Sequence, residues 1–244
     1  MNENIATIWV YLAQTPLLWL AATLAVYQVA GWIYRTSGQL ALLNPVLVAI
    51  IALVVILRST DTTYTTYFDG AQFVHFLLGP ATVALAIPLY LHAEKLRQIL
   101  IPLLITLLIG ACSAILFTAA IGAALGLDPT NLRSMLPRSV TTPIAMGISQ
   151  QIGGLPSLTA VLVILTGIVG ALTAPTLLNW MNVRDQSVQG FAIGLTSHGI
   201  GTARAFQLSA EAGAFSGLAM GLNGAATTLL MPLLMPLVQQ MLHW

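Results

Sequence analysis

Long apolar segments, each close to the length that crosses a lipid bilayer, constrain the fold of this chain more than any other feature. A helix needs about 20 mainly apolar residues to span the hydrocarbon core of a membrane. Six segments meet or approach that length: 7–34, 40–57, 72–91, 99–125, 157–180 and 213–241. Only 6% of the residues are charged, whereas about 25% is usual in a soluble domain. The sequence therefore predicts an all-α, polytopic integral membrane protein.

Net charge, cysteine content and missing motifs argue against several function classes. A net charge of +1 offers no basic face to nucleic acid. The single cysteine, Cys112, allows neither an internal disulfide nor a cysteine metal cluster. The chain has no HExxH, P-loop or dinucleotide fingerprint, and its GLTSHG stretch is not a GxSxG nucleophile motif. We therefore expect no enzymatic activity, no cofactor, no bound metal and no nucleic-acid partner.

Basic residues in the loops predict an orientation in the membrane. The first apolar segment is too long for a cleaved signal peptide, so we interpret it as a retained helix. Lysine and arginine favour cytoplasmic loops. If residues 134–150 enter the membrane and return on the same side, one side of the membrane carries Arg35, Lys95, Arg97 and Arg184. The other side carries Arg58 and Arg133. This distribution predicts an outside N-terminus and an inside C-terminus.

Two groups of three segments predict an inverted repeat inside a single domain, 1–244. The first repeat covers about 40–125 and the second about 157–241. Each middle segment carries helix-breaking residues: Gly79, Pro80 and Pro88 in 72–91, and Ser197, His198, Gly199 and Gly201 in 188–207. Three crossings per repeat, with a returning segment between the repeats, give them opposite topologies. Interrupted helices at matching positions of inverted repeats point to a transporter's binding site.

The stretch GLTSHGIGTAR, residues 194–204, places polar and flexible residues inside an apolar region. Backbone groups freed by a broken helix cannot face lipid, and the N-terminus of the next half-helix favours an anion. An arginine inside a membrane costs about 2.5–3.5 kcal/mol, which makes Arg204 a functional candidate. The alternative is an interfacial loop in which Arg204 reaches the lipid headgroups. His198 either carries a coupled proton or is a neutral donor to a backbone carbonyl.

The stretch LPRSVTTPIAM, residues 136–146, is the second polar segment. Its Arg138 has the geometry to hold a carboxylate through two hydrogen bonds, and the alternative is a surface arginine paired with Asp128. The sequence also leaves open a salt bridge between Arg204 and Glu211. The GxxxG pattern Gly217–Gly221 predicts close helix packing near Asn223. The candidate substrate-binding residues, with Asn44 and Asn223 as additions, are Arg138, Ser139, Thr141, Thr142, Ser197, His198, Gly199, Gly201, Thr202 and Arg204.

Several motifs resemble those of the LrgB/CidB family, in order from about residue 40 to 235. They are LLNPVLVA, LLGPATVALAIPLY, LPRSVTTPIAM, GFAIGLTSHGIGTARAFQL and EAGAFSGLAMGLNGAATTLLMPLL. Members of the family are bacterial inner-membrane proteins, and the plastid glycolate/glycerate translocator contains a similar domain. The resemblance implies a fold like that of the cation/proton antiporters and bile-acid symporters, whose interrupted helices cross at the membrane midplane.

The resemblance implies two functions. One is transport of small monocarboxylates such as glycolate, glycerate, pyruvate or lactate, coupled to protons and assisted by a small LrgA/CidA-type membrane partner. In this case Arg138 and Arg204 attract the carboxylate, and the hydroxyl residues bind its oxygens. The other is antiholin-like regulation of murein hydrolase export and autolysis, without transport. A pore-forming holin ranks third because holins are usually small. We expect a transporter in the bacterial inner membrane, surrounded by lipid and capable of forming a homo-oligomer.

Overall fold

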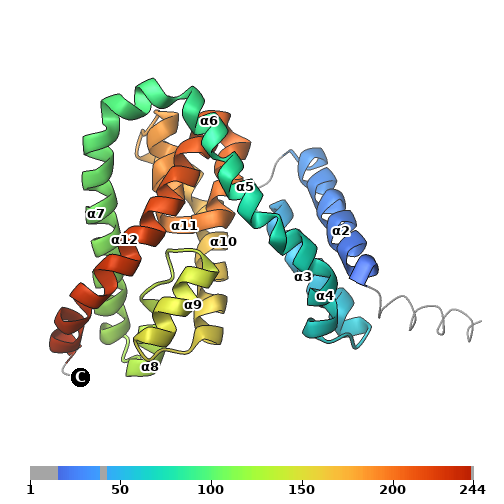
Figure 1. The fold of residues 1–244 in the computed structure, drawn as a ribbon, viewed down its shortest axis with the longest axis horizontal. Helices are drawn as coiled ribbons and strands as arrows, with labels where there is room; N and C mark the ends of the chain where they lie inside the picture. Colours follow the sequence, from blue (N-terminus) through green and yellow to red (C-terminus); the bar gives the residue numbers. More distant parts are fainter. Residues whose placement is uncertain (1–15, 39–42, 243–244) are drawn as a thin grey trace, which may run out of the picture. The chain divides into compact units, whose positions relative to one another are not determined.

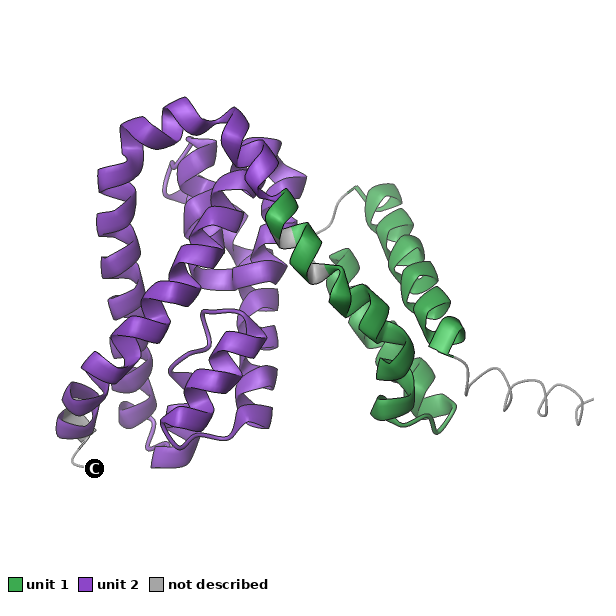
Figure 2. Cartoon of the chain, viewed as in Figure 1, with its two compact units in different colours: residues 1–84 green, residues 85–244 purple. Residues whose placement is uncertain are grey.

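The computed structural model describes residues 16–38 and 43–242, and this part of the chain is helical and contains no β-strand. The helices follow one another as shown in Figure 1: α2 (Pro16–Thr36), α3 (Pro45–Ser59), α4 (Tyr64–Phe76), α5 (Leu78–Ala84), α6 (Ala86–Leu91), α7 (Ala93–Ala124), α8 (Pro129–Met135), α9 (Thr142–Gln151), α10 (Pro156–Trp180), α11 (Gln186–Leu208) and α12 (Ala210–Leu242). They form two compact units, residues 1–84 and 85–244 (Figure 2). The prediction of an all-α protein is confirmed.

Five helical stretches among the described residues are long and apolar enough to cross a membrane: Pro16–Thr36, Tyr64–Leu91, Ala93–Ala124, Pro156–Trp180 and Ala210–Gln240. Helix α3 is also apolar but has only 15 residues. Residues 7–15 and 40–42 of the predicted segments lie outside the described residues. Large apolar side chains such as Ile101, Ile105 and Ile109 are more than half exposed on α7, as lipid-facing side chains would be. The prediction of a polytopic membrane protein is confirmed.

Two prolines explain why the stretch 64–91 is divided into three helices. Turns at Leu77 and Leu85 separate α4, α5 and α6. Leu77 lies three residues before Pro80, and Leu85 lies three residues before Pro88. Proline has no backbone N–H and its ring clashes with the carbonyl four residues earlier, which here belongs to the last residue of the preceding helix. The predicted interruption of this segment is therefore present.

Unit 1 is organised around a close contact between α2 and α4. The Trp19 and Tyr67 rings meet edge to face with their centroids 5.9 Å apart. A Cβ atom at Gly70 would clash with the Pro16 carbonyl oxygen and lie 2.8 Å from the Trp19 Cβ atom. The small residue at position 70 therefore allows the two helices to approach, and Trp19 is buried between them.

Helices α11 and α12 of unit 2 pack closely against each other. Cβ atoms built at Gly190 and Gly194 would clash with the backbone carbonyls of Ala212 and Ser216. A glycine every fourth residue thus lets the two backbones meet, as in a GxxxG contact. The GxxxG pattern Gly217–Gly221 predicted close helix packing near Asn223. A Cβ atom built at Gly217 would lie 2.9 Å from the Leu85 side chain, whereas the space around Gly221 is open. Both patterns have the same spacing, and only the tertiary arrangement distinguishes them.

Residues 129–151 form the helical pair α8 and α9, and the predicted segment 134–150 comprises the end of α8, a turn over residues 136–141 and most of α9. The ten residues of α9 rise about 15 Å, half of a hydrocarbon core, so α9 is too short to cross the membrane. The buried Thr159 hydroxyl on α10 lies 2.9 Å from the Ser134 carbonyl oxygen and 2.7 Å from the Ser149 hydroxyl. These contacts hold both short helices against α10 (Figure 1).

A cluster of charges joins the beginnings of α7, α11 and α12. The Lys95 Nζ atom lies 2.8 Å from an Asp185 carboxylate oxygen and 2.7 Å from a Glu211 carboxylate oxygen. Glu211 is thus paired with Lys95, in place of the salt bridge to Arg204 that the sequence left open. The Lys95 ammonium and the Ser187 hydroxyl donate hydrogen bonds to Asp185 and hold the pKa of its carboxyl well below the usual range.

This depressed pKa predicts how stability depends on pH. Because folding lowers the Asp185 pKa, its contribution is complete above the unfolded pKa of about 4 and is lost as pH falls towards the folded value. We expect Asp185→Asn to lower the Tm in detergent at pH 7 by no more than about 2–4 °C, since the pair is partly exposed. Asparagine retains the cap of α11. Melting curves between pH 3 and 8, with Asp69→Asn as the control, should show the Tm difference between the wild type and Asp185→Asn shrinking below pH 4. A Tm difference that stays constant with pH would exclude the ion pair as its source.

Candidate functional site

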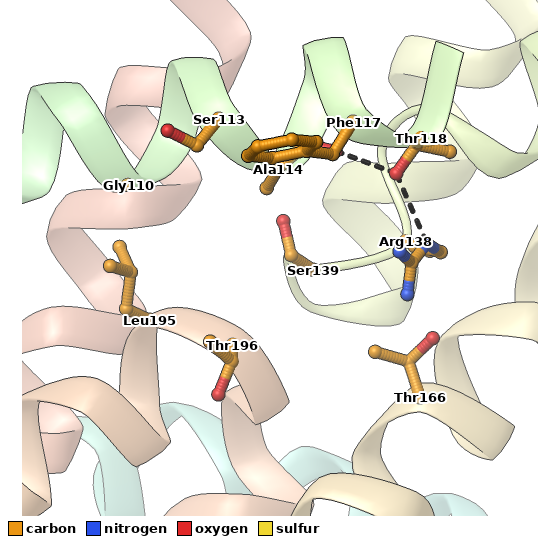
Figure 3. A pocket seen from close by; sticks show the side chains of 10 residues that line it. All are labelled: Gly110, Ser113, Ala114, Phe117, Thr118, Arg138, Ser139, Thr166, Leu195 and Thr196. Carbon is orange, nitrogen blue, oxygen red and sulfur yellow. Dashed lines mark hydrogen bonds between the residues drawn. The ribbon is translucent and has the colours of Figure 1, made fainter. Parts of the chain in front are cut away.

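A pocket of about 350 Å³ in unit 2 brings together three helices and one turn (Figure 3). Helix α7 contributes Gly110, Ser113, Ala114, Phe117 and Thr118, the turn contributes Arg138 and Ser139, α10 contributes Thr166, and α11 contributes Leu195 and Thr196. Arg138 is the charged residue of this lining, and five of its neighbours carry hydroxyl groups. The volume lies at the lower end of the range for small-molecule sites. The pocket therefore has the size and the charge to hold a small anion.

The backbone of the turn positions Arg138. Its amide donates to the Met135 carbonyl at 3.1 Å, and its Nε atom donates to the Thr118 hydroxyl at 3.3 Å. Figure 3 shows the guanidinium between the side chains of Thr118 and Thr166. Among the described residues no carboxylate lies within ion-pair distance of it. The alternative partner Asp128 instead accepts hydrogen bonds from the first backbone N–H groups of α8.

The predicted interruption of α11 is present at His198. Its φ of 41° and ψ of −135° lie outside the helical region, so the helix breaks between its two halves. The buried ring places Nε2 2.9 Å from the Val163 carbonyl oxygen, and this contact requires Nε2 to be the donor because a carbonyl only accepts. A Cβ atom at Gly167 would lie 2.7 Å from the ring. Gly167 of α10 therefore makes room for the histidine at the break.

Asn223 connects the two polar segments that the sequence analysis singled out. Its amide nitrogen donates to the Leu195 carbonyl at 2.9 Å and to the Ser139 carbonyl at 3.3 Å. Both of these residues line the pocket. The turn 136–141 and the broken helix α11 thus meet at one buried side chain of α12.

Three predicted residues lie near the break without lining the pocket. The Thr202 hydroxyl donates to the His198 carbonyl at 2.8 Å and lies 3.0 Å from the Ser216 hydroxyl. Gly201 packs against Ser197, whose side chain is buried. All three residues therefore help to pack the broken helix in the interior of unit 2.

The remaining predicted residues do not line the pocket either. Arg204 is half-buried and donates to the Gln207 side chain at 2.8 Å. Thr141 precedes α9 and Thr142 begins it, while Gly199 is exposed. Asn44 belongs to unit 1, where its side chain caps α3 by accepting from the Val46 amide at 2.9 Å. Of the twelve candidates, Arg138 and Ser139 are the ones that line the pocket.

The face that α7 presents to the pocket was not predicted from the sequence. Its lining residues recur every three to four positions: Gly110, Ser113, Ala114, Phe117 and Thr118. This spacing puts them on one side of a helix. Small and hydroxyl residues at helical spacing within a long apolar segment are a signal that could have identified this face.

Comparison with known proteins agrees with the motifs. Residues 23–237 match the model of the LrgB-like family. YwbG of Bacillus subtilis (strain 168), whose name calls it an uncharacterized protein, is 36% identical over 216 residues, which cover 88% of this chain and 96% of YwbG. The antiholin-like protein LrgB of Bacillus cereus (strain B4264) is 29% identical over 224 residues, which cover 92% of this chain and 97% of that protein. No solved structure matches. The family match extends over most of the chain, which therefore belongs to the LrgB-like family.

Proposed function

We propose that this protein transports small monocarboxylates and that the Arg138 pocket binds the carboxylate. One observation carries the proposal: a half-buried guanidinium lines a pocket with five hydroxyl residues, and no described carboxylate lies within ion-pair distance of it. Charge-assisted bonds from arginine to a carboxylate are short and strong, and they select a planar anion. We assign recognition to Arg138 over Arg204 because Arg138 lines the pocket.

The other lining residues suit a small acid. Phe117 and Leu195 offer apolar contact to a short carbon chain. The hydroxyls of Ser113, Thr166 and Thr196 can donate to the carboxylate or bond a hydroxyl or keto group of the same molecule. Glycolate, glycerate, lactate and pyruvate all have this chemistry. We further propose that transport is coupled to protons, with His198 at the helix break as the proton carrier.

Antiholin-like regulation is the second candidate function. The name of the Bacillus cereus relative calls it an antiholin-like protein, and this name favours regulation over transport. In this role the chain would act in the bacterial inner membrane on murein hydrolase export, together with a small LrgA/CidA-type membrane protein, and would move no solute itself.

Uptake into proteoliposomes distinguishes the two functions. The protein is reconstituted alone and with the small partner, and labelled glycolate, lactate and pyruvate are supplied with and without an inward proton gradient. We expect saturable uptake that the gradient stimulates. Uptake that requires the partner would indicate a two-component transporter. Absence of uptake under every condition would contradict transport and leave regulation as the proposal.

A further inference from the structure

We propose that Asn223 is a positioning residue of the Arg138 pocket: it holds the turn that carries Arg138 at a set distance from the broken helix α11. This inference rests on the proposed function, since it assigns Asn223 a role in shaping the carboxylate site. Asn223 acts through the backbone of its neighbours and does not touch the bound anion. Its side chain is only 1% exposed, and it is absent from the pocket lining.

The chemistry of its partners determines how the amide of Asn223 is oriented. The Ser139 and Leu195 carbonyl oxygens can only accept hydrogen bonds, so the amide nitrogen must face both of them. The amide oxygen accepts from the Thr227 hydroxyl at 3.2 Å, one turn further along α12. Both N–H groups and the oxygen are thus satisfied inside unit 2, and an unsatisfied buried group would be costly.

Both carbonyls belong to backbone that regular helix does not stabilise. Ser139 lies in the turn between α8 and α9, and Leu195 lies three residues before the break at His198. Carbonyls in the last turn before a helix ends need donors from outside the helix. Asn223 supplies such a donor to α11 and at the same time ties it to the turn. Ser139 directly follows Arg138 in the chain, and Leu195 directly precedes Thr196. Because the bridge holds Ser139 and Leu195, it sets the distance between the two lining residues Arg138 and Thr196.

Two substitutions remove the bridge in different ways. Asn223→Asp keeps the shape of the side chain but places a negatively charged oxygen, which cannot donate, against the two carbonyls. Asn223→Leu keeps the branched shape of the side chain and removes its polar atoms, so it tests the loss of the hydrogen bonds without adding a charge to the interior. The matched control is Thr228→Val on the same helix, which removes only a hydrogen bond to the Gly224 carbonyl.

The first readout is the uptake of labelled glycolate into proteoliposomes. We expect both Asn223 variants to raise KM roughly tenfold or more, because two hydrogen bonds that hold the site are lost. Vmax per correctly folded protein should change far less, and Thr228→Val should match the wild type. A residue with a purely structural role would reduce the amount of folded protein and leave KM unchanged. An unchanged KM in both variants would overturn the proposal.

The second readout does not depend on transport. Spin labels at Gln150 on α9, the helix that follows the turn, and at Gln186 on α11, both exposed, report the distance between these helices in a Cys112→Ser background. We expect a narrow distance distribution in the wild type and in Thr228→Val, and a broad or shifted one in both Asn223 variants. A narrow, unshifted distribution in these variants would contradict the bridge. Altered distances in a protein that takes up no glycolate would keep the bridge and refute the proposed transport.

Discussion

Arg138→Gln is expected to raise the KM for carboxylate uptake about 100-fold or more in a protein that still folds and inserts into membranes. The substitution removes the positive charge of the pocket and the donors that face its interior, while the long polar side chain keeps a bond to Thr118 within reach. Hydrogen bonds to a charged group contribute about 1.5–3 kcal/mol each, so losing a two-pronged contact should weaken binding by about 100-fold or more. The measurement is the KM for glycolate, lactate and pyruvate in proteoliposomes.

Two further variants sharpen this prediction. Arg138→Lys keeps the charge but not the planar pair of donors, so we expect uptake between that of the wild type and of Arg138→Gln. Arg184→Gln is the matched control, because Arg184 is exposed in the loop before α11, lies outside the pocket and donates to the Asn182 side chain at 2.9 Å. Uptake with wild-type KM in Arg138→Gln would show that the anion binds elsewhere.

Gly194→Leu is expected to prevent the folding of unit 2. Even the first carbon of the new side chain would clash with the Ser216 backbone carbonyl, and a backbone carbonyl cannot rotate away as a side chain can. Helices α11 and α12 would have to separate, which would disturb the break at His198 and the Asn223 bridge together. Overpacking typically costs about 1–3 kcal/mol, and a clash between two backbones should exceed that range. The yield of monodisperse protein in detergent and its Tm measure the effect.

Gly221→Ala provides the control for this second prediction. Position 221 lies on α12 as well, but no atom lies within 4 Å of a Cβ atom built there. Alanine should therefore stabilise the helix by about 0.5–1 kcal/mol and raise the Tm slightly. If Gly194→Leu melted like Gly221→Ala, the close approach of α11 and α12 would be contradicted.

Residues close together in the sequence determined much of the architecture. The length of the apolar segments predicts membrane helices because one helix satisfies its own backbone hydrogen bonds in lipid. Pro80 and Pro88 end helices through a clash four residues away, and the glycine-rich stretch around His198 marks the break in α11. Each of these effects acts within about one helical turn, so sequence alone was sufficient to predict it.

Only the tertiary structure decided which polar residues form a site. Arg138 and Arg204 lie in equally polar stretches, yet only Arg138 lines the pocket, because α7 and α10 supply the walls around it. Asn223 meets Ser139 from 84 residues away, and Lys95 meets Glu211 from 116 residues away. Such contacts depend on which helices pack together and with what rotation. In this protein that choice follows from small residues such as Gly190 and Gly194, whose role is visible only against the partner helix.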